Sequence, residues 1–372
     1  MKIRAFITHK VKEKFTDCQD RFSINPDTKS VAVSDGMSQS WQQKIWAQLL
    51  VDTFANSCEW LPTHESIKPL CYKWREEVER FIQNLKDNNA PENLIYRNER
   101  NLAEKRSAGA TFVGIRFIGM NWSGIVLGDS CLIEWDGENT IFHTSQHTDS
   151  FDNRPDFFDS NPLCQGKGTH KNINGTISDN SVILLVSDPF SDFLFEHSKQ
   201  GDVATYIHQL LNIASHEVFE TVVEEWRKNG MHNDDTTLII IENDNSEDIT
   251  INHPDDIAEM IEKEKFILTI EKEASKELEE NKIGSSVTEK AIDKLEQDVT
   301  TEDTNPPTIP VNADTFIKFF LNEYKSILEN KCKGTSQKEI KKFLGKLKYE
   351  TTQKAAEEAL RIILKKYIIH AR

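Results

Sequence analysis

The stretch SVAVSDGMSQS, residues 30–40, passes from an apolar run to a carboxylate and a glycine within a few positions. The run of Val and Ala is typical of a β-strand, and Asp35 followed by Gly36 is a common turn signal. Taken alone, the stretch predicts only a strand that ends in a turn. A charged carboxylate at the edge of an apolar core costs free energy unless something compensates it. What matters is therefore whether other strands end in the same way.

Aspartates lie at the ends of further strand-like runs. They are Asp20 in DCQDRFSI, Asp129 in SGIVLGDSCLIEW, Asp188 in VILLVSDPFSDFL, and Asp234 with Asp235 in HNDDTTLIIIE. One such residue is explained by a turn or a helix cap, and for Asp129 a simple hairpin aspartate is an equal alternative. Several in one domain indicate a cluster held together by cations. Because every donor is an oxygen, the pattern favours Mg²⁺ or Mn²⁺ over zinc.

Composition and charge exclude several classes of function. The net charge of -16 argues against nucleic acid or an anionic membrane as the main partner, because both are polyanions. We find no apolar run of about 18 residues, so no transmembrane helix is expected. The start, MKIRAFITHK, reads as a strand and not as a signal peptide. The six cysteines lie far apart, which is typical of reduced thiols, and we expect a cytoplasmic protein.

The strand-like segments predict an α+β fold. Many of them follow one another without an intervening helix, which favours two packed antiparallel β-sheets flanked by helices. We expect strands over residues 3–8, 21–25, 30–34, 111–117, 123–127, 131–135, 140–143, 182–187 and 236–242. We expect helices over residues 41–54 and 66–86, where apolar residues recur at three- and four-residue spacing, and a helical region over 203–226.

The character of the sequence changes after about residue 243. Residues 244–311 are acidic, polar and marked by proline, which predicts a linker that is partly helical or disordered. Residues 312–372 are rich in lysine and carry apolar helical stripes and the capping-box spacing SQKE at 336–339. We expect a small basic helical bundle there. Its outer lysines are either a solvated face or a docking surface for a protein partner, and both readings stay open.

Five pieces of the chain, in order, carry a family resemblance. They are CQDRFSI, VAVSDGM, SAGATFVGIRF with GIVLGDS, LLVSDPFSD and DDTTLIII. Residues 1–242 resemble the metal-dependent protein phosphatases of type 2C, the PPM family, and in particular the bacterial branch whose first motif reads Gln-Asp. The resemblance implies a catalytic domain over residues 1–243 with an α-β-β-α sandwich and a two-metal site at one end of it.

The resemblance also implies roles for the aspartates. The metal ligands it implies are Asp20, Asp35, which would bridge the two ions, the carbonyl of Gly36, Asp188 and Asp234, with Asp129 at a weaker third metal. The implied activity is hydrolysis of phosphoserine and phosphothreonine in proteins. The implied mechanism is direct attack on a phosphomonoester by a hydroxide that bridges two Mg²⁺ or Mn²⁺ ions. Hydrolysis of a small phosphoester is a further possibility.

Several positions depart from the family pattern. Met37 stands where animal members have a histidine, Phe15 where many members have a phosphate-binding arginine, and Pro189 where glycine follows the fourth aspartate. His9, on the same segment as Phe15, is our candidate for a phosphate contact or proton donor, with a structural role as the alternative. The rival function is a pseudophosphatase that keeps the fold and recruits a partner through its C-terminal helices. The intact aspartates argue against it.

Overall fold

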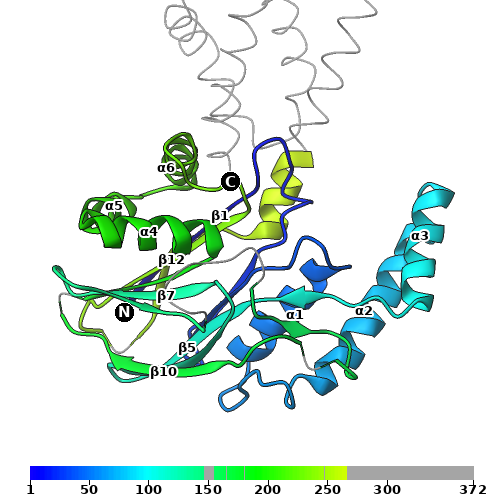
Figure 1. Ribbon diagram of the computed structural model, residues 1–372, viewed down its shortest axis with the longest axis horizontal. Coiled ribbons are helices and arrows are strands. Elements are labelled where there is room, and N and C mark those ends of the chain that lie inside the picture. The colour runs from blue at the N-terminus through cyan, green and yellow to red at the C-terminus, as the bar shows by residue number, and fades with distance from the viewer. Residues whose placement is uncertain (146–154, 165, 180, 247, 266–372) are drawn as a thin grey trace, which may run out of the picture. The chain divides into compact units, whose positions relative to one another are not determined.

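The computed structural model describes residues 1–145, 155–164, 166–179, 181–246 and 248–265 (Figure 1). All of them belong to the first of two units into which the chain divides, Met1–Asn281. The expected basic bundle over residues 312–372 lies outside the described residues, as do residues 266–311 of the expected linker. The division of the chain into three domains therefore stays a prediction.

Two largely antiparallel sheets form the centre of this unit. Their strands are β1 (Lys2–Thr8), β2 (Arg21–Asn25), β3 (Ser30–Ser34), β5 (Phe112–Ile118), β6 (Asn121–Leu127), β7 (Cys131–Trp135), β8 (Thr140–His143), β10 (Lys171–Thr176), β11 (Val182–Val186), β12 (Thr236–Glu242) and β13 (Thr250–Pro254). The larger sheet has the order β13-β1-β12-β11-β7-β8, and the smaller has the order β10-β6-β5-β3-β2. A short third sheet pairs β4 (Gly109–Ala110) with β9 (Phe158–Asp159).

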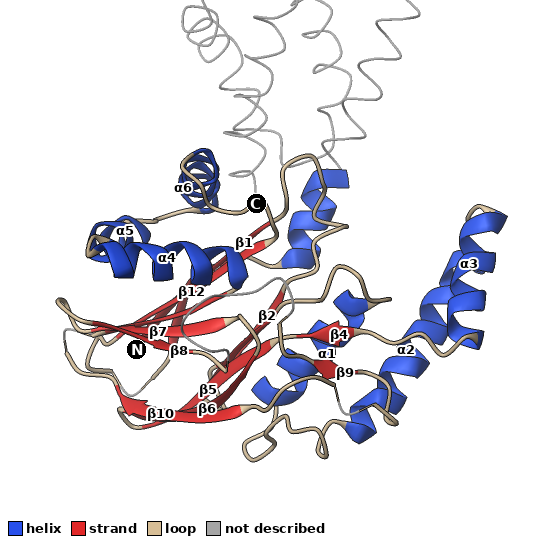
Figure 2. Ribbon diagram, viewed as in Figure 1, coloured by secondary structure: helices blue, strands red, loops and turns tan. Residues whose placement is uncertain are grey.

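Helices lie on the outer sides of the two sheets, and the third of them packs on the second and not on a sheet (Figure 2). They are α1 (Gln43–Ala55), α2 (Lys68–Asp87), α3 (Glu92–Ala103), α4 (Asp188–Gln200), α5 (Val203–Leu211) and α6 (His216–Lys228). Apolar residues of α1 and α2 share a buried cluster with the smaller sheet, and those of α4, α5 and α6 share one with the larger sheet. A third cluster joins the inner faces of both sheets. The expected α+β sandwich of two packed antiparallel sheets flanked by helices is confirmed.

Strand β12 shows why the central strands read as continuous apolar runs. Successive side chains of a strand point to opposite faces. Ile239 and Ile241 enter the cluster between the sheets, whereas Leu238 and Ile240 enter the cluster beneath α4, α5 and α6. All four side chains are fully buried. Since both faces are covered, no polar alternation remains in the sequence of this strand.

Three helical regions differ from the sequence-based expectation. The first is α3, which was not predicted. Residues 203–226 form α5 and α6 with a break between them, where Ser215 caps α6 and accepts a hydrogen bond from the amide of Val218. Helix α4 was not predicted, because its sequence directly follows a buried strand without a polar spacer. Pro189 lies in the first turn of α4, where proline's fixed φ suits a helix and its missing N–H costs nothing.

The folded unit also continues past residue 243, where the sequence predicts a linker. Strand β13 pairs in parallel with β1 at the edge of the larger sheet, and residues 257–265 are helical. Asp255, which is only 6% exposed, accepts hydrogen bonds from the amide of Ile7 at 2.9 Å and from Nδ1 of His216 at 2.6 Å. An edge strand with one covered face needs few apolar residues, so the sequence of β13 was interpreted as part of a linker. Among the described residues, no helix is long and apolar enough to span a membrane.

Candidate functional site

The first two predicted ligands meet at one end of the smaller sheet. Asp20 directly precedes β2 and Asp35 directly follows β3. The two strands pair antiparallel, with Arg21 opposite Ser34, so the antiparallel register places both aspartates at the same end of the hairpin. Both belong to the set of strand-end aspartates from which a cluster was expected.

The larger sheet contributes carboxylates from a matching pair of strands. Asp188 follows β11 after one residue, and Asp234 and Asp235 directly precede β12. Because β11 and β12 pair antiparallel, these aspartates also lie at one end of their sheet. Asp129 lies between β6 and β7, where the chain crosses from the smaller sheet to the larger one.

A hydrogen bond joins the aspartate-bearing end of the smaller sheet to that of the larger sheet. The hydroxyl of Thr237, on β12, donates to Oδ2 of Asp20 at 2.7 Å. The amide of Thr237 donates to Oγ of Ser187 at 2.9 Å, and Ser187 precedes Asp188 at the start of α4. Asp20 is fully buried, so this link holds a carboxylate of the smaller sheet against the strands of the larger one. Neither Thr237 nor Ser187 was singled out from the sequence.

Thr111 links Asp35 to the loop between β6 and β7, which carries Asp129. The amide of Asp35 donates to Oγ1 of Thr111 at 3.2 Å, and the amide of Thr111 donates to the carbonyl of Asp35 at 2.9 Å. Oγ1 of Thr111 lies 2.6 Å from Oγ of Ser130, the neighbour of Asp129. The backbone at Asp35 is therefore fixed relative to the loop that carries Asp129.

Gly36 is required here for a packing reason. A Cβ at this position would lie 2.9 Å from Cγ of Gln43, at the start of α1, and 3.1 Å from the carbonyl oxygen of Gln19. From the sequence we attributed the missing side chain to the approach of a metal ion. A side chain here would require Gln43 or the backbone at Gln19 to shift, so the glycine alone is not evidence for a metal.

Burial and mutual repulsion together raise the pKa values of these carboxylates. Burial is the largest cause that raises the pKa of Asp35 well above its ordinary value, and four neighbouring carboxylates raise it further: those of Asp20, Asp188, Asp129 and Asp234. The pKa of Asp188 is also raised, by burial and then by Asp129, Asp234 and Asp20. Such a set is destabilising without a compensating cation.

Asp234 and Asp235 have different partners. Oδ1 of Asp234 lies 2.9 Å from Nζ of Lys10, and the same ammonium donates to Oγ of Ser38 at 3.2 Å. The two oxygens of Asp235 accept the backbone amides of Lys10 at 3.0 Å and Gln19 at 2.8 Å. Asp235 therefore closes the base of the loop between these residues, while Asp234 meets a charged side chain.

The donor set fits a hard divalent cation, but the side chains do not yet converge on one. Oδ1 of Asp20 is buried and has no hydrogen-bond partner among the described residues, and a buried oxygen of this kind is a suitable ligand for Mg²⁺ or Mn²⁺. In the part of the chain that the structure describes, no three His, Cys, Asp or Glu side chains form a group that could hold a metal ion as they stand. Binding would require the carboxylates to close in, and one oxygen of Asp234 is already paired with Lys10.

The side chain of His9 contacts Phe15, Glu264 and the backbone of Lys10. Its Nδ1 is 2.8 Å from the carbonyl oxygen of Lys10, and its Nε2 is 4.0 Å from Oε1 of Glu264. Its ring packs edge-on against Phe15, with centroids 4.7 Å apart. Glu264, whose Oε2 also accepts the amide of Phe15 at 3.1 Å, belongs to the helix after β13. The imidazole ring of His9 is thus held by the loop and by this helix.

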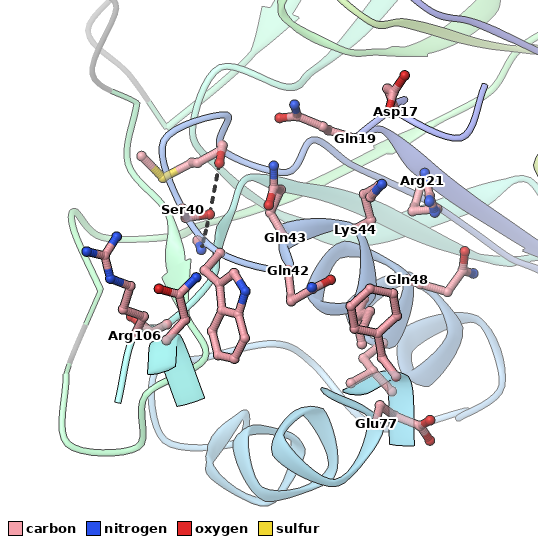
Figure 3. Close-up of a pocket in the computed structure, with 18 of the residues that line it drawn as sticks. Asp17, Gln19, Arg21, Ser40, Gln42, Gln43, Lys44, Gln48, Glu77 and Arg106 are labelled. Carbon is pink, nitrogen blue, oxygen red and sulfur yellow. Dashed lines mark hydrogen bonds between the residues drawn. The ribbon is translucent and has the colours of Figure 1, made fainter. Parts of the chain in front are cut away.

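A cleft of about 1540 Å³ adjoins the carboxylates. It is lined by Gln19, next to Asp20, and by Met37, next to Gly36. Figure 3 shows Gln43 near its centre, between Gln19 and the side chain of Ser40. The cleft was not predicted from the sequence, although the run of amides in SQSWQQKIWAQ, residues 38–48, indicates a polar surface.

Comparison with known proteins finds likeness only at the level of structure. No family model and no curated protein matches the sequence. Similar solved structures include a bacterial serine phosphatase (15% identity, TM-score 0.41, 64% of this chain and 96% of that one). Another is the serine/threonine phosphatase Stp1 from Staphylococcus aureus (14%, 0.42, 65% and 95%). A third is the catalytic domain of the serine threonine protein phosphatase PstP in complex with two manganese ions (13%, 0.35, 64% and 96%). No residue role is transferred from them to this chain.

Proposed function

We propose that this chain is a metal-dependent serine/threonine protein phosphatase. The observation that carries the proposal is the gathering of carboxylates from the ends of both sheets, where they raise one another's pKa. A fold that keeps such a repulsive set needs a cation to offset it, and a site that holds divalent cations beside a cleft suits a phosphorylated substrate. The sequence motifs around these aspartates point to the same activity.

The proposed ligands of two Mg²⁺ or Mn²⁺ ions are Asp20, Asp35, Asp188 and Asp234 together with the carbonyl of Gly36. Asp129 is proposed for a third, weaker ion. When bound, such ions activate water as a nucleophile for direct attack on phosphorus and offset the charge of the phosphoryl oxygens. Asp235 is left out of this set, because both of its oxygens are engaged by backbone amides.

Lys10 replaces His9 as our candidate for the phosphate contact. Burial by itself lowers the pKa of Lys10, but the hydrogen bond and charge of Asp234 raise it above its ordinary value, so the side chain is cationic. Its ammonium is held between Asp234 and Ser38, at the edge of the carboxylate cluster. A cation in this place can bind a phosphoryl oxygen, whereas His9 is held by the loop and by Glu264.

The experiment is a turnover assay of the full chain with p-nitrophenyl phosphate and with a phosphoserine peptide. We expect release of phosphate from both in Mn²⁺ or Mg²⁺, complete loss in EDTA, and recovery when the metal is returned. Turnover that survives EDTA contradicts the proposal. Binding of Mn²⁺ by calorimetry with no turnover of either substrate supports the pseudophosphatase instead. Turnover of p-nitrophenyl phosphate alone supports a hydrolase of small phosphoesters.

A further inference from the structure

The cleft beside the carboxylates is continuous with the candidate site. Gln19 and Met37, which line it, are the chain neighbours of Asp20 and Gly36. Gly109, also in the lining, precedes Ala110, and Ala110 bridges to Gly36. A phosphorylated residue placed at the aspartates would therefore carry its flanking groups into this cleft.

The lining of the cleft is rich in amides. Seven of its thirty lining residues are Gln or Asn, among them Gln19, Gln39, Gln42, Gln43 and Gln48. We name it the amide cleft. Each amide side chain offers both a donor and an acceptor, which is what the N–H and C=O groups of a peptide backbone require.

Part of this lining is held in place by the protein itself. Oδ1 of Asn98, on α3, accepts hydrogen bonds from Nε2 of Gln42 at 3.1 Å and from Nε1 of Trp41 at 3.0 Å. Gln43 packs against Gly36. Oε1 of Gln19 is buried and has no hydrogen-bond partner within the described ranges of the chain. A buried, unused acceptor is costly, and a donor from a ligand would satisfy it.

Opposite charges lie on the two sides of the amide cleft. Glu13 and Asp17, on the loop that follows β1, line one side and are exposed. Arg97 on α3 and Arg106 after it are exposed lining residues from the other part of the chain. In Figure 3, Asp17 and Arg106 lie on opposite sides, with Gln43 between them. Arg21 and Lys44 also line the cleft near Asp17, but their cationic groups donate to backbone carbonyls. The exposed charges of the cleft are therefore acidic on one side and basic on the other.

The size of the amide cleft argues against a small molecule as its occupant. Pockets for small ligands typically enclose about 300–1,000 Å³, and this cleft encloses about 1540 Å³. A phosphoester with no more atoms than a sugar would leave most of the amides unused. A stretch of polypeptide several residues long would reach both charged sides.

We propose that the amide cleft binds the polypeptide on both sides of the substrate's phosphorylated residue, and that its two charged sides select peptides of one charge polarity. The proposal rests on the proposed phosphatase function. It adds the class of substrate and the residues that would recognise it. The favoured substrate carries basic residues on the flank that meets Glu13 and Asp17. It carries acidic residues on the flank that meets Arg97 and Arg106.

The test uses two phosphoserine peptides of identical composition. One has lysines before and glutamates after the phosphoserine, and the other has the reverse order. For the full-length chain in Mn²⁺, we expect kcat/KM to differ between them by about fivefold or more, since an exposed ion pair changes an equilibrium by up to about fivefold. The double variant Arg97→Glu with Arg106→Glu is expected to erase or invert this ratio. Glu13→Lys with Asp17→Lys tests the opposite side in a separate protein.

Lys228→Glu is the matched control, because Lys228 is an exposed residue of α6 outside the amide cleft. It is expected to keep both the wild-type ratio and the wild-type turnover of p-nitrophenyl phosphate. Equal kcat/KM for the two peptides in the wild type, or an unchanged ratio in both double variants, overturns the proposal.

Binding of the same two peptides, followed by fluorescence anisotropy, separates this proposal from the proposed function. A binding preference that disappears in the double variants, without turnover of any phosphoester, supports the amide cleft while the phosphatase function fails. Turnover of both peptides with no preference in rate or binding supports the phosphatase function while the cleft proposal fails.

Discussion

Nζ of Lys10 lies 2.9 Å from Oδ1 of Asp234, so a cation of the chain itself neutralises a carboxylate that we propose as a metal ligand. Lys10 is only 15% exposed at its side chain and Asp234 is 38% exposed. A divalent ion that binds Oδ1 of Asp234 must compete with this ammonium. The pair therefore couples metal binding to the position of the loop that carries Lys10.

Lys10→Met is expected to tighten Mn²⁺ binding, because the competing charge is removed. Since exposed or half-exposed ion pairs are worth up to about 1 kcal/mol, the dissociation constant measured by calorimetry should fall by roughly fivefold. The KM for a phosphoserine peptide should rise in the same variant if Lys10 binds phosphate. Lys12→Met, on the same loop, is the control. Weaker Mn²⁺ binding by Lys10→Met would show that Lys10 supports the metal and does not compete with it.

Asp35→Asn and Asp234→Asn are each expected to lower turnover of p-nitrophenyl phosphate by at least about a hundredfold, as when metal activation of water is lost. Calorimetric titration with Mn²⁺ should show weaker binding in both. Asp27→Asn, in the turn at the opposite end of the β2–β3 hairpin, serves as the control with wild-type turnover. Wild-type rates in both variants, in a protein that binds Mn²⁺, would refute the assignment of the site.

Asp20→Asn is expected to stabilise the metal-free fold at alkaline pH. Burial, and then repulsion from Asp235, raise the pKa of Asp20 to about 7. A raised acid pKa in the folded state means that ionisation opposes folding, so wild-type stability falls as the pH rises from about 4 to about 7. Asn cannot ionise and still accepts the hydrogen bond from Thr237. One pKa unit corresponds to about 1.4 kcal/mol, so the gain at pH 8 is on the order of a few kcal/mol.

The measurement is urea unfolding in EDTA at pH 4 and at pH 8, for wild type, Asp20→Asn and the control Asp27→Asn. The free energy of unfolding of Asp20→Asn should exceed that of wild type at pH 8, and the two should be nearly equal at pH 4. Addition of Mn²⁺ at pH 8 should stabilise the wild type more than Asp20→Asn. A variant that is less stable than wild type at pH 8 in EDTA would mean that the charge of Asp20 is already compensated within the protein.

His9→Ala is expected to cause similar, modest losses of activity on an alkyl phosphoserine substrate and on p-nitrophenyl phosphate. The reason is that its ring packs on Phe15 and its nitrogens face Lys10 and Glu264, so its removal loosens the loop and leaves leaving-group protonation untouched. Nitrophenolate hardly needs a proton, whereas an alkoxide does. A selective loss on phosphoserine would restore His9 as the general acid.

Shortening the chain after residue 244 is expected to destabilise the first unit. The cut removes β13 and Asp255, which holds the amide of Ile7 and the ring of His216. A loss of roughly 3 kcal/mol corresponds to about 5–10 °C in the midpoint of thermal unfolding for a domain of this size. Differential scanning calorimetry of chains that end at residues 244 and 265 makes the comparison. Equal midpoints would show that the strand after residue 249 contributes nothing.

The chain that ends at residue 265 also tests the prediction for the C-terminal module. If residues 312–372 recruit a substrate or partner, its turnover of p-nitrophenyl phosphate should match that of the full chain. Its kcat/KM toward a physiological phosphoprotein should be lower. Equal activity on both substrates would remove the recruiting role.

The sequence by itself determined the strands of the two sheets except β10 and β13, and it located the aspartates at their ends. Both follow from signals that lie within a few residues of one another: an apolar run such as residues 236–241, a turn such as Asp35 with Gly36, and the period of two along a strand. The same local signals predicted α1 and α2. They did not separate α4 from the strand before it, and they left β13 as a linker, because a polar edge strand has no strong pattern of its own.

Only the tertiary structure decided which aspartate has which partner. Asp234 and Asp235 are neighbours in the sequence, yet one meets the ammonium of Lys10 and the other meets two backbone amides. Lys10 and Asp235 are 225 positions apart, and no local pattern relates them. The amide cleft likewise joins the loop after β1, the start of α1, α3 and the helix after β13. Such contacts depend on how the sheets and helices pack, and packing is set by the whole core and not by any one segment of sequence.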